Sequence, residues 1–254
     1  MRRRKRCTEK RGVFMAQNVL VTGAGRETAM GFNFVRRYLE QGDHVFATVR
    51  RPCEALEKLR ERYPDTLDIL EIDIGSTESV RAAAAAIAAR VPCLDLIINN
   101  AVITTQDYKT HSSFEDTTLD DIAGAVDVSA VGPLRIVQAM QPLLYQSAGT
   151  AMVVNISSSC GSIGLCTTDR DFDYYLSKCA VNMGTKILYN KYAADKKVRM
   201  LAIHPGWVRT NPGNEKAPFD PYEQCEKMRL IFENRRESFD GVIFVNYDNE
   251  EMPW

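Results

Sequence analysis

Residues 18–32 read NVLVTGAGRETAMGF, and this stretch decides the fold. An apolar run of strand type ends at Thr22, a glycine-rich turn follows, and a helical pattern begins directly after the turn. Glycine lets backbone N–H groups come close to a phosphate, and a helix N-terminus adds positive potential at the same place. The order of strand, turn and helix therefore favours a dinucleotide-binding unit. The alternative is a tight turn that needs glycine only for its backbone dihedrals.

The rest of the chain repeats this alternation of strand and helix. Further apolar runs of strand type span residues 44–48, 68–72, 94–99, 151–156, 198–203 and 242–247. Several are almost continuously apolar, as strands buried on both faces of a parallel sheet are. Helical patterns span residues 28–41, 53–63, 76–90, 119–147 (with an interruption expected at Gly132-Pro133), 174–195 and 222–235. Ser76 is expected to cap the third helix, and Gly42 to end the first. The alternation predicts a Rossmann-type, doubly wound parallel sheet of about seven strands.

Composition and charge set the domain organisation. The 254 residues contain no linker, so we expect one α/β domain over residues 17–254. Residues 1–16 are expected to form a disordered basic extension, because residues 1–14 carry seven basic residues and one acid. Binding of nucleic acid or membrane through residues 2–11 is the alternative for this segment. For the rest of the chain we expect neither nucleic acid nor a membrane as a partner. No apolar run approaches the roughly 20 residues that span a bilayer.

The seven cysteines predict a reduced, cytoplasmic protein. They are scattered, form no CxxC pair, and have no histidine at metal-ligand spacing. We therefore expect free thiols and no structural metal.

Residues after the second strand select the cofactor. An acid usually stands there in NAD-binding proteins and accepts from the ribose 2′-hydroxyl. Here Arg50 and Arg51 stand there, and no acid occurs before Glu54. Guanidinium groups suit a 2′-phosphate, and Arg26 in the glycine turn is a further candidate. We therefore predict NADP(H), with NAD(H) as the alternative if these arginines are ordinary surface residues.

Tyr174 and Lys178 are the candidate acid–base pair. They are four residues apart, so they share one helix face, and a serine cluster at 157–159 follows the fifth strand. A nearby ammonium is expected to stabilise the phenolate and lower the tyrosine pKa. Taken alone, such a pair is more often a chance surface pair. A separate apolar stripe on this helix is expected to pack against the protein, namely Leu176, Ala180, Met183 and Ile187.

Five motifs in one order carry a family resemblance. They are TGAGRETAMG (22–31), NNA (99–101), NISSSCG (155–161), YYLSK (174–178) and HPGWVRT (204–210). Together they resemble the classical short-chain dehydrogenase/reductase family, and the C-terminal segment 240–254 looks like its carbonyl-reductase branch near the sniffer and C-factor proteins. The resemblance covers about residues 17–254. It implies an NADP(H)-dependent oxidoreductase that acts on a small carbonyl or alcohol. The family contains monomers, dimers and tetramers, and a homodimer is the oligomer we expect here.

The resemblance also implies roles for individual residues. Ser158 would orient the substrate, Tyr174 would be the acid–base, Lys178 would activate it and hold the ribose, and Ser129 stands where the family has a catalytic asparagine. The implied cofactor-binding residues are Gly23, Gly25, Arg26, Thr28, Gly31, Arg50, Asp73, Ile74, Asn100, Ala101, Tyr174, Lys178, Pro205, Gly206, Val208 and Thr210.

The chain departs from the family pattern at four positions. Glu27 and Ala29 stand where the family's glycine turn has glycines, Val102 replaces another glycine, and Ser129 replaces asparagine. A carboxylate at Glu27 would oppose a pyrophosphate or obstruct the turn, unless it points to solvent or pairs with Arg26. These departures motivate an alternative function, a catalytically impaired dinucleotide-binding signalling protein. The substrate is not identified, although residues 211–221 are expected to cover its pocket.

Overall fold

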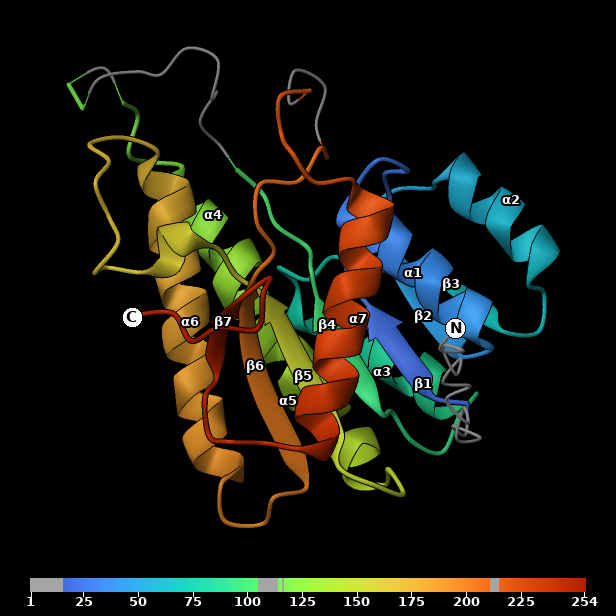
Figure 1. Cartoon of the computed structure of the whole chain (residues 1–254). Helices are drawn as coiled ribbons and strands as arrows, with labels where there is room; N and C mark the ends of the chain where they lie inside the picture. Colours follow the sequence, from blue (N-terminus) through green and yellow to red (C-terminus); the bar gives the residue numbers. More distant parts are fainter. Residues whose placement is uncertain (1–15, 105–113, 116, 211–214) are drawn as a thin grey trace, which may run out of the picture.

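One parallel sheet forms the centre of the molecule (Figure 1). The computed structural model describes residues 16–104, 114–115, 117–210 and 215–254. Within them, seven strands lie in the order β3-β2-β1-β4-β5-β6-β7, and every neighbouring pair is parallel. The predicted doubly wound Rossmann-type α/β fold is confirmed. The basic segment 1–15 lies outside the described residues, so its expected disorder stays a prediction.

The elements follow the predicted alternation closely. The strands are β1 Asn18–Val21, β2 His44–Val49, β3 Leu67–Glu71, β4 Leu96–Asn99, β5 Ala151–Ile156, β6 Val198–His204 and β7 Phe244–Asn246. The helices are α1 Met30–Gln41, α2 Glu54–Arg62, α3 Thr77–Ala88, α4 Ile122–Val126, α5 Gly132–Tyr145, α6 Phe172–Tyr192 and α7 Pro221–Glu237, with a π turn η1 at Asp127–Val131 and a 3-10 turn η2 at Ser159–Gly161. The Ser76 hydroxyl caps α3 by accepting from the Ser79 N–H, and Gly42 ends α1 at a φ of +89°.

Two apolar cores lie on opposite faces of the sheet. Helices α1, α2 and α7 cover one face, and α3, α5 and α6 cover the other (Figure 1). The strands supply both cores, because successive side chains point to opposite faces. In β1, Val19 and Val21 join the first core and Leu20 joins the second. A strand buried on both faces explains the continuous apolar runs in the sequence.

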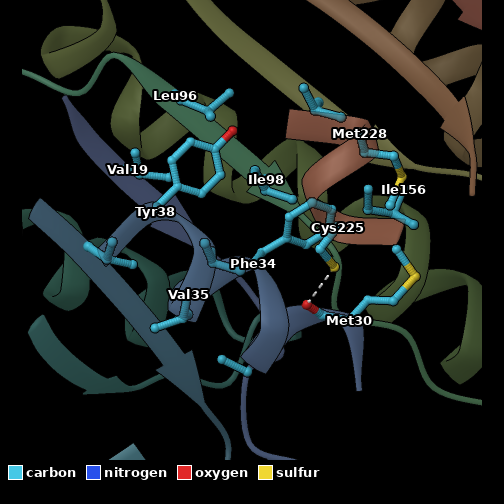
Figure 2. Close-up of a cluster of buried hydrophobic side chains, with 14 of the residues drawn as sticks. Val19, Met30, Phe34, Val35, Tyr38, Leu96, Ile98, Ile156, Cys225 and Met228 are labelled. Atoms are coloured by element: carbon cyan, nitrogen blue, oxygen red, sulfur yellow. Dashed lines mark hydrogen bonds between the residues drawn. The ribbon is translucent and has the colours of Figure 1, made fainter. Parts of the chain in front are cut away.

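The first core holds the start of α1 in place (Figure 2). Phe34 and Tyr38 of α1 are almost fully buried there, beside Met228 of α7. The thiol of Cys225 in α7 donates to the Met30 carbonyl at 3.4 Å. Packing and this bond fix the first turn of α1, which directly follows the glycine turn.

The predicted helix over 119–147 needs correction. The α-helical pattern is interrupted by the π turn η1, which ends directly before Gly132-Pro133, and α5 begins at that dipeptide. Pro133 has no N–H to donate to the carbonyl four residues earlier, which favours a locally wider turn.

The same segment also corrects the expectation that no stretch is long and apolar enough to span a bilayer. Ile122–Tyr145 is, among the described residues, a stretch long and apolar enough by composition to cross a membrane. Its apolar side packs in the second core, where Ile136, Val137 and Met140 are fully or almost fully buried. Packing on the sheet therefore accounts for part of this apolar composition, since 39% of the apolar stretch is buried.

The apolar stripe of α6 faces outward, contrary to the prediction. Leu176, Met183 and Ile187 are 49%, 62% and 59% exposed. The buried face of α6 instead carries Ser177, Lys178, Val181, Asn182 and Thr185. Most of these side chains are polar and form hydrogen bonds inside the protein, which stabilise the buried face. The spacing of apolar residues alone does not reveal these bonds.

Candidate active site

The structure brings the predicted site residues to one edge of the sheet. This is the carboxyl edge of the strands, the place where ligands bind in open α/β sheets. After β1 come Gly23, Gly25, Arg26 and Thr28, and the first turn of α1 contains Gly31. Arg50 follows β2, the loop after β3 contains Asp73 and Ile74, and the loop after β4 contains Asn100 and Ala101. Ser158 follows β5, the loop after β6 contains Pro205, Gly206, Val208 and Thr210, and helix α6 carries Tyr174 and Lys178. Part of the expected pocket cover, residues 211–214, lies outside the described residues.

The glycine turn is closely packed at two points. Gly23 has a φ of +73°, which favours glycine, and a Cβ there would lie 2.7 Å from the Ala101 Cα. A Cβ on Gly31 would lie 2.4 Å from the Gly23 carbonyl oxygen and 2.6 Å from Asn100 Nδ2. Gly31 therefore provides the close helix–strand packing that the last glycine of such a turn provides.

Glu27 and Ala29 do not obstruct the turn. Neither has a positive φ, and Ala29 is an extended residue at φ −84°, ψ 159°. The Glu27 side chain is exposed. Glycines at these two positions are therefore not required by backbone conformation. The alternative that Glu27 pairs with Arg26 is not met, since the described residues contain no ion pair between them.

The turn fits a dinucleotide pyrophosphate. Helix α1 has 12 residues, its N-cap is Ala29, no side chain caps it, and its first turn contains no acid. The first N–H groups of a helix lack intrahelical acceptors and carry partial positive charge. An anion beside Gly23 and Gly31 would satisfy them, and the tight glycine packing leaves no Cβ in its way.

Three arginines lie around this turn without acidic partners. Arg26, Arg50 and Arg51 are exposed, and in the part of the chain that the structure describes none of them is in an ion pair. Gly25 and Val49 bring the two loops together, because a Cβ on Gly25 would lie 3.4 Å from Val49 Cγ1. These guanidinium groups are therefore available to a phosphate.

The loops after β3 and β6 are held by specific bonds. The Asp73 carboxylate accepts from the Gly75 N–H at 2.9 Å. After β6, the Gln224 side chain of α7 donates to the Pro205 carbonyl at 2.6 Å. Gly206 has a φ of +81°, and a Cβ there would lie 2.6 Å from the Phe219 ring. Both loops thus have defined shapes at the same edge.

Ser158, Tyr174 and Lys178 form one cluster. The Tyr174 and Ser158 side chains are hydrogen-bonded to each other, and the Ser158 hydroxyl also accepts from the Cys160 N–H at 3.1 Å. Lys178 is only 4% exposed, and its Nζ donates to the Ile156 carbonyl at 2.7 Å. The same Nζ lies 5.4 Å from the centroid of the Tyr174 ring. An ammonium, a phenol and a hydroxyl therefore meet where β5 ends.

Burial dominates the ionisation of this cluster. It raises the pKa of Tyr174 to about 12, although the hydrogen bond from Ser158 acts in the opposite direction. It lowers the pKa of Lys178 to about 8. The expectation that the ammonium lowers the tyrosine pKa is therefore not met here, because desolvation of the phenolate is the larger effect. At neutral pH the phenol keeps its proton and the amine is mostly charged.

Ser129 bonds to the backbone of Ile103, and its role at the position of the family's catalytic asparagine stays a prediction. Ser129 is almost fully buried in η1. Its hydroxyl donates to the Ile103 carbonyl at 3.2 Å and accepts from the Ile103 N–H at 3.1 Å. These bonds anchor the chain after β4.

Sequence reasoning missed the side chains that hold α6 on the sheet. Asn182 accepts from the Ser157 hydroxyl at 2.6 Å and donates to the Gly161 carbonyl at 2.9 Å. A Cβ on Gly161 would lie 2.8 Å from the Lys178 carbonyl oxygen, so η2 and α6 touch through backbone. The available signal was spacing, because Asn182 stands four residues after Lys178 on the same helix face.

Sequence reasoning also missed the support of the loop after β3. Arg135 of α5 forms an ion pair with Asp127 at 2.6 Å and donates to the Ile74 carbonyl at 3.4 Å. Arg135 and Asp127 are eight residues apart, with Asp127 at the start of η1 and Arg135 beyond its end. The three- and four-residue spacings of a regular helix would not have predicted this pair.

Known proteins match the chain over most of its length. The family model described as "Enoyl-(Acyl carrier protein) reductase" matches residues 23–235. C-signal of Myxococcus xanthus is 29% identical over 161 residues, which are 63% of this chain and 93% of that protein. The NADPH-bound carbonyl reductase from chicken fatty liver is 30% identical, with a TM-score of 0.83 over 95% of this chain and 100% of that one. The carbonyl reductase Sniffer of D. melanogaster is 25% identical, with a TM-score of 0.82 over 94% of this chain and 100% of that one.

Proposed function

The chain belongs to the short-chain dehydrogenase/reductase family of oxidoreductases, and on this premise we propose that it reduces a small carbonyl, or oxidises the matching alcohol, with NADP(H). One observation carries the proposal. The cluster of Ser158, Tyr174 and Lys178 lies at the same sheet edge as the glycine turn after β1. The NADPH bound to the related chicken enzyme supports the choice of cofactor.

This geometry supports the residue roles that we propose. A bound nicotinamide would supply a hydride to the carbonyl carbon. Tyr174, protonated at neutral pH, donates its hydroxyl proton to the carbonyl oxygen, and the Ser158 hydroxyl orients that oxygen. Lys178 places a positive charge beside the phenolate that remains. Ser129 anchors Ile103 in the loop after β4 and takes the position of the family's catalytic asparagine. The cofactor-binding residues are those expected from the motifs.

Turnover with activated carbonyls tests the function. Purified protein and NADPH are mixed with activated ketones, quinones or aldehydes, and nucleotide absorbance reports oxidation. We expect substrate-dependent loss of NADPH. NADPH that binds but is never oxidised would favour the alternative, a dinucleotide-binding signalling protein, for which the hydroxyl of Ser129 bound to Ile103 is the motivating observation. Absence of any NADPH binding would contradict both functions.

The unpaired arginines predict cofactor selectivity. Arg50→Ala combined with Arg51→Ala is expected to raise the Kd for NADPH at least about 100-fold, because charge-assisted hydrogen bonds contribute about 1.5–3 kcal/mol each and both guanidinium groups are removed. The Kd for NADH should change less than about twofold, since NADH has no 2′-phosphate to lose contact with. Fluorescence titration of both nucleotides measures this. The matched control is Arg60→Ala with Arg62→Ala on α2, which removes the same charge elsewhere and should leave both Kd values unchanged.

The outward stripe of α6 supports a homodimer. Leu134 of α5 packs on α6, since a Cβ on Gly184 would lie 3.2 Å from its side chain, and Leu134 is itself 36% exposed. With Leu176, Met183 and Ile187 it forms one apolar face, which we call the α5/α6 face. Helix α6 has 21 residues and is about 31 Å long, so this face can extend along a whole interface between two copies. The proposed occupant is a second copy of this chain.

Introducing charge on the α5/α6 face is expected to produce monomers. Met183→Glu with Ile187→Glu would bury unpaired carboxylates in the interface, so the dimer dissociation constant should rise at least about 100-fold. Light scattering over a concentration series measures the mass. Leu230→Glu, which places the same charge on an exposed leucine of α7, should leave the dimer intact. A wild-type protein that is monomeric at all concentrations would contradict the dimer. The cytoplasmic location stays a prediction.

A further inference from the structure

The side chain of Asn33 is buried beneath the glycine turn. It is only 4% exposed, in the first turn of α1. Its Nδ2 donates to the Ala29 carbonyl at 2.9 Å and to the Glu27 carbonyl at 3.3 Å. A buried amide that binds two carbonyls of one turn constrains the orientation of both peptide groups. None of the motifs assigned a role to this residue.

The direction of these bonds matters for an anion. In a trans peptide the carbonyl and the following N–H point in opposite directions. Because Asn33 holds the carbonyls of Glu27 and Ala29 on the protein side, the N–H groups of Thr28 and Met30 point away from Asn33. N–H groups turned outward at an uncapped helix start form an anion-binding concavity.

Three further carbonyls of the turn, those of Thr22, Gly23 and Arg26, also accept hydrogen bonds. Asn100 Nδ2 donates to the Thr22 carbonyl at 3.0 Å and the Gly23 carbonyl at 3.2 Å. The Arg26 carbonyl accepts from the Ala29 N–H at 2.9 Å. On the outer side, the Thr28 hydroxyl donates to the Thr210 carbonyl at 3.2 Å, joining the turn to the loop after β6. These three carbonyls, together with those of Glu27 and Ala29, therefore point at protein donors.

We infer that Asn33 is a positioning residue for the pyrophosphate of the dinucleotide. It orients the peptides around Glu27 and Ala29, the positions at which the turn lacks the expected glycines. The inference rests on the proposed NADP(H) binding. It concerns the pyrophosphate at the centre of the cofactor, so it separates from the 2′-phosphate contacts at Arg50 and Arg51.

Two nucleotides of different length test this role. NADPH contains the pyrophosphate, whereas adenosine 2′-monophosphate contains only the adenine, the ribose and the 2′-phosphate. Asn33→Leu, close in size but without a donor, should raise the Kd for NADPH about 10-fold and leave the Kd for adenosine 2′-monophosphate within twofold. Calorimetric titration of the full chain measures both without any turnover. The control variant, with alanine at Arg50 and Arg51, should raise the Kd for both nucleotides.

A second variant grades the effect. Asn33→Thr keeps a hydroxyl that reaches the carbonyl four residues earlier, at Ala29, but not the Glu27 carbonyl. It should raise the Kd for NADPH about threefold, and it remains informative if Asn33→Leu fails to fold. Unchanged NADPH affinity in a folded variant would overturn the inference. An equal loss for both nucleotides would overturn it too, since that pattern marks general damage. Wild-type protein that binds neither nucleotide would instead refute the proposed function.

Discussion

Replacing Tyr174 by phenylalanine is expected to lower turnover about 1000-fold while the Kd for NADPH changes less than about threefold. In the proposed mechanism the phenol hydroxyl donates a proton to the substrate oxygen, and positioned general acids contribute about 10²- to 10⁴-fold. The Tyr174 pKa of about 12 keeps this donor protonated across the neutral range. Steady-state kinetics with NADPH and an activated ketone gives the turnover, and nucleotide titration gives the Kd.

The neighbouring tyrosine supplies the matched control. Tyr175 is on the same helix, but its hydroxyl is hydrogen-bonded to Cys160, and the proposed mechanism gives it no role. Tyr175→Phe removes the same atom one residue away and should keep turnover within about threefold. If Tyr174→Phe turned over like the wild type, the assigned acid–base role would be wrong even though the fold and family would stand.

Gly31→Ala is expected to lower the free energy of unfolding by about 3 kcal/mol, the upper part of the range for overpacking. The new Cβ would lie 2.4 Å from the Gly23 carbonyl oxygen and 2.9 Å from its carbon, so backbone must move and not merely a flexible side chain. For a chain of this size the Tm should fall by roughly 6–12 °C. NADPH affinity should fall at least about 10-fold, since the displaced atoms belong to the turn that would hold the pyrophosphate. Calorimetry and nucleotide titration measure the two effects.

Gly124→Ala provides the comparison. Gly124 is exposed in α4, and a Cβ there meets nothing within 4 Å. Alanine should stabilise the helix by about 0.5–1 kcal/mol, because glycine loses more backbone entropy on folding. Equal Tm values for the Gly31 and Gly124 variants would show that the close approach of α1 to β1 is not a real constraint.

Local sequence was enough for the fold and for most of the site. The apolar runs predicted a parallel sheet because a strand buried on both faces needs apolar residues at successive positions, as in Val19, Leu20 and Val21. The motif residues then had to meet, because the carboxyl ends of parallel strands lie at one edge. The spacing of Tyr174 and Lys178 placed them on one helix face, as the structure has them.

Tertiary structure decided what depends on contacts between distant segments. The sequence predicted that Leu176, Met183 and Ile187 would pack inward, yet the opposite face of α6 is buried, because Asn182 and Lys178 bond to groups of η2 and β5. The sequence also suggested that Glu27 and Ala29 weaken the turn. In three dimensions Gly31 makes the close packing and Asn33 holds the peptides. Periodicity reports only how apolar a helix face is, whereas hydrogen-bond partners and backbone approach depend on which segments the fold brings together.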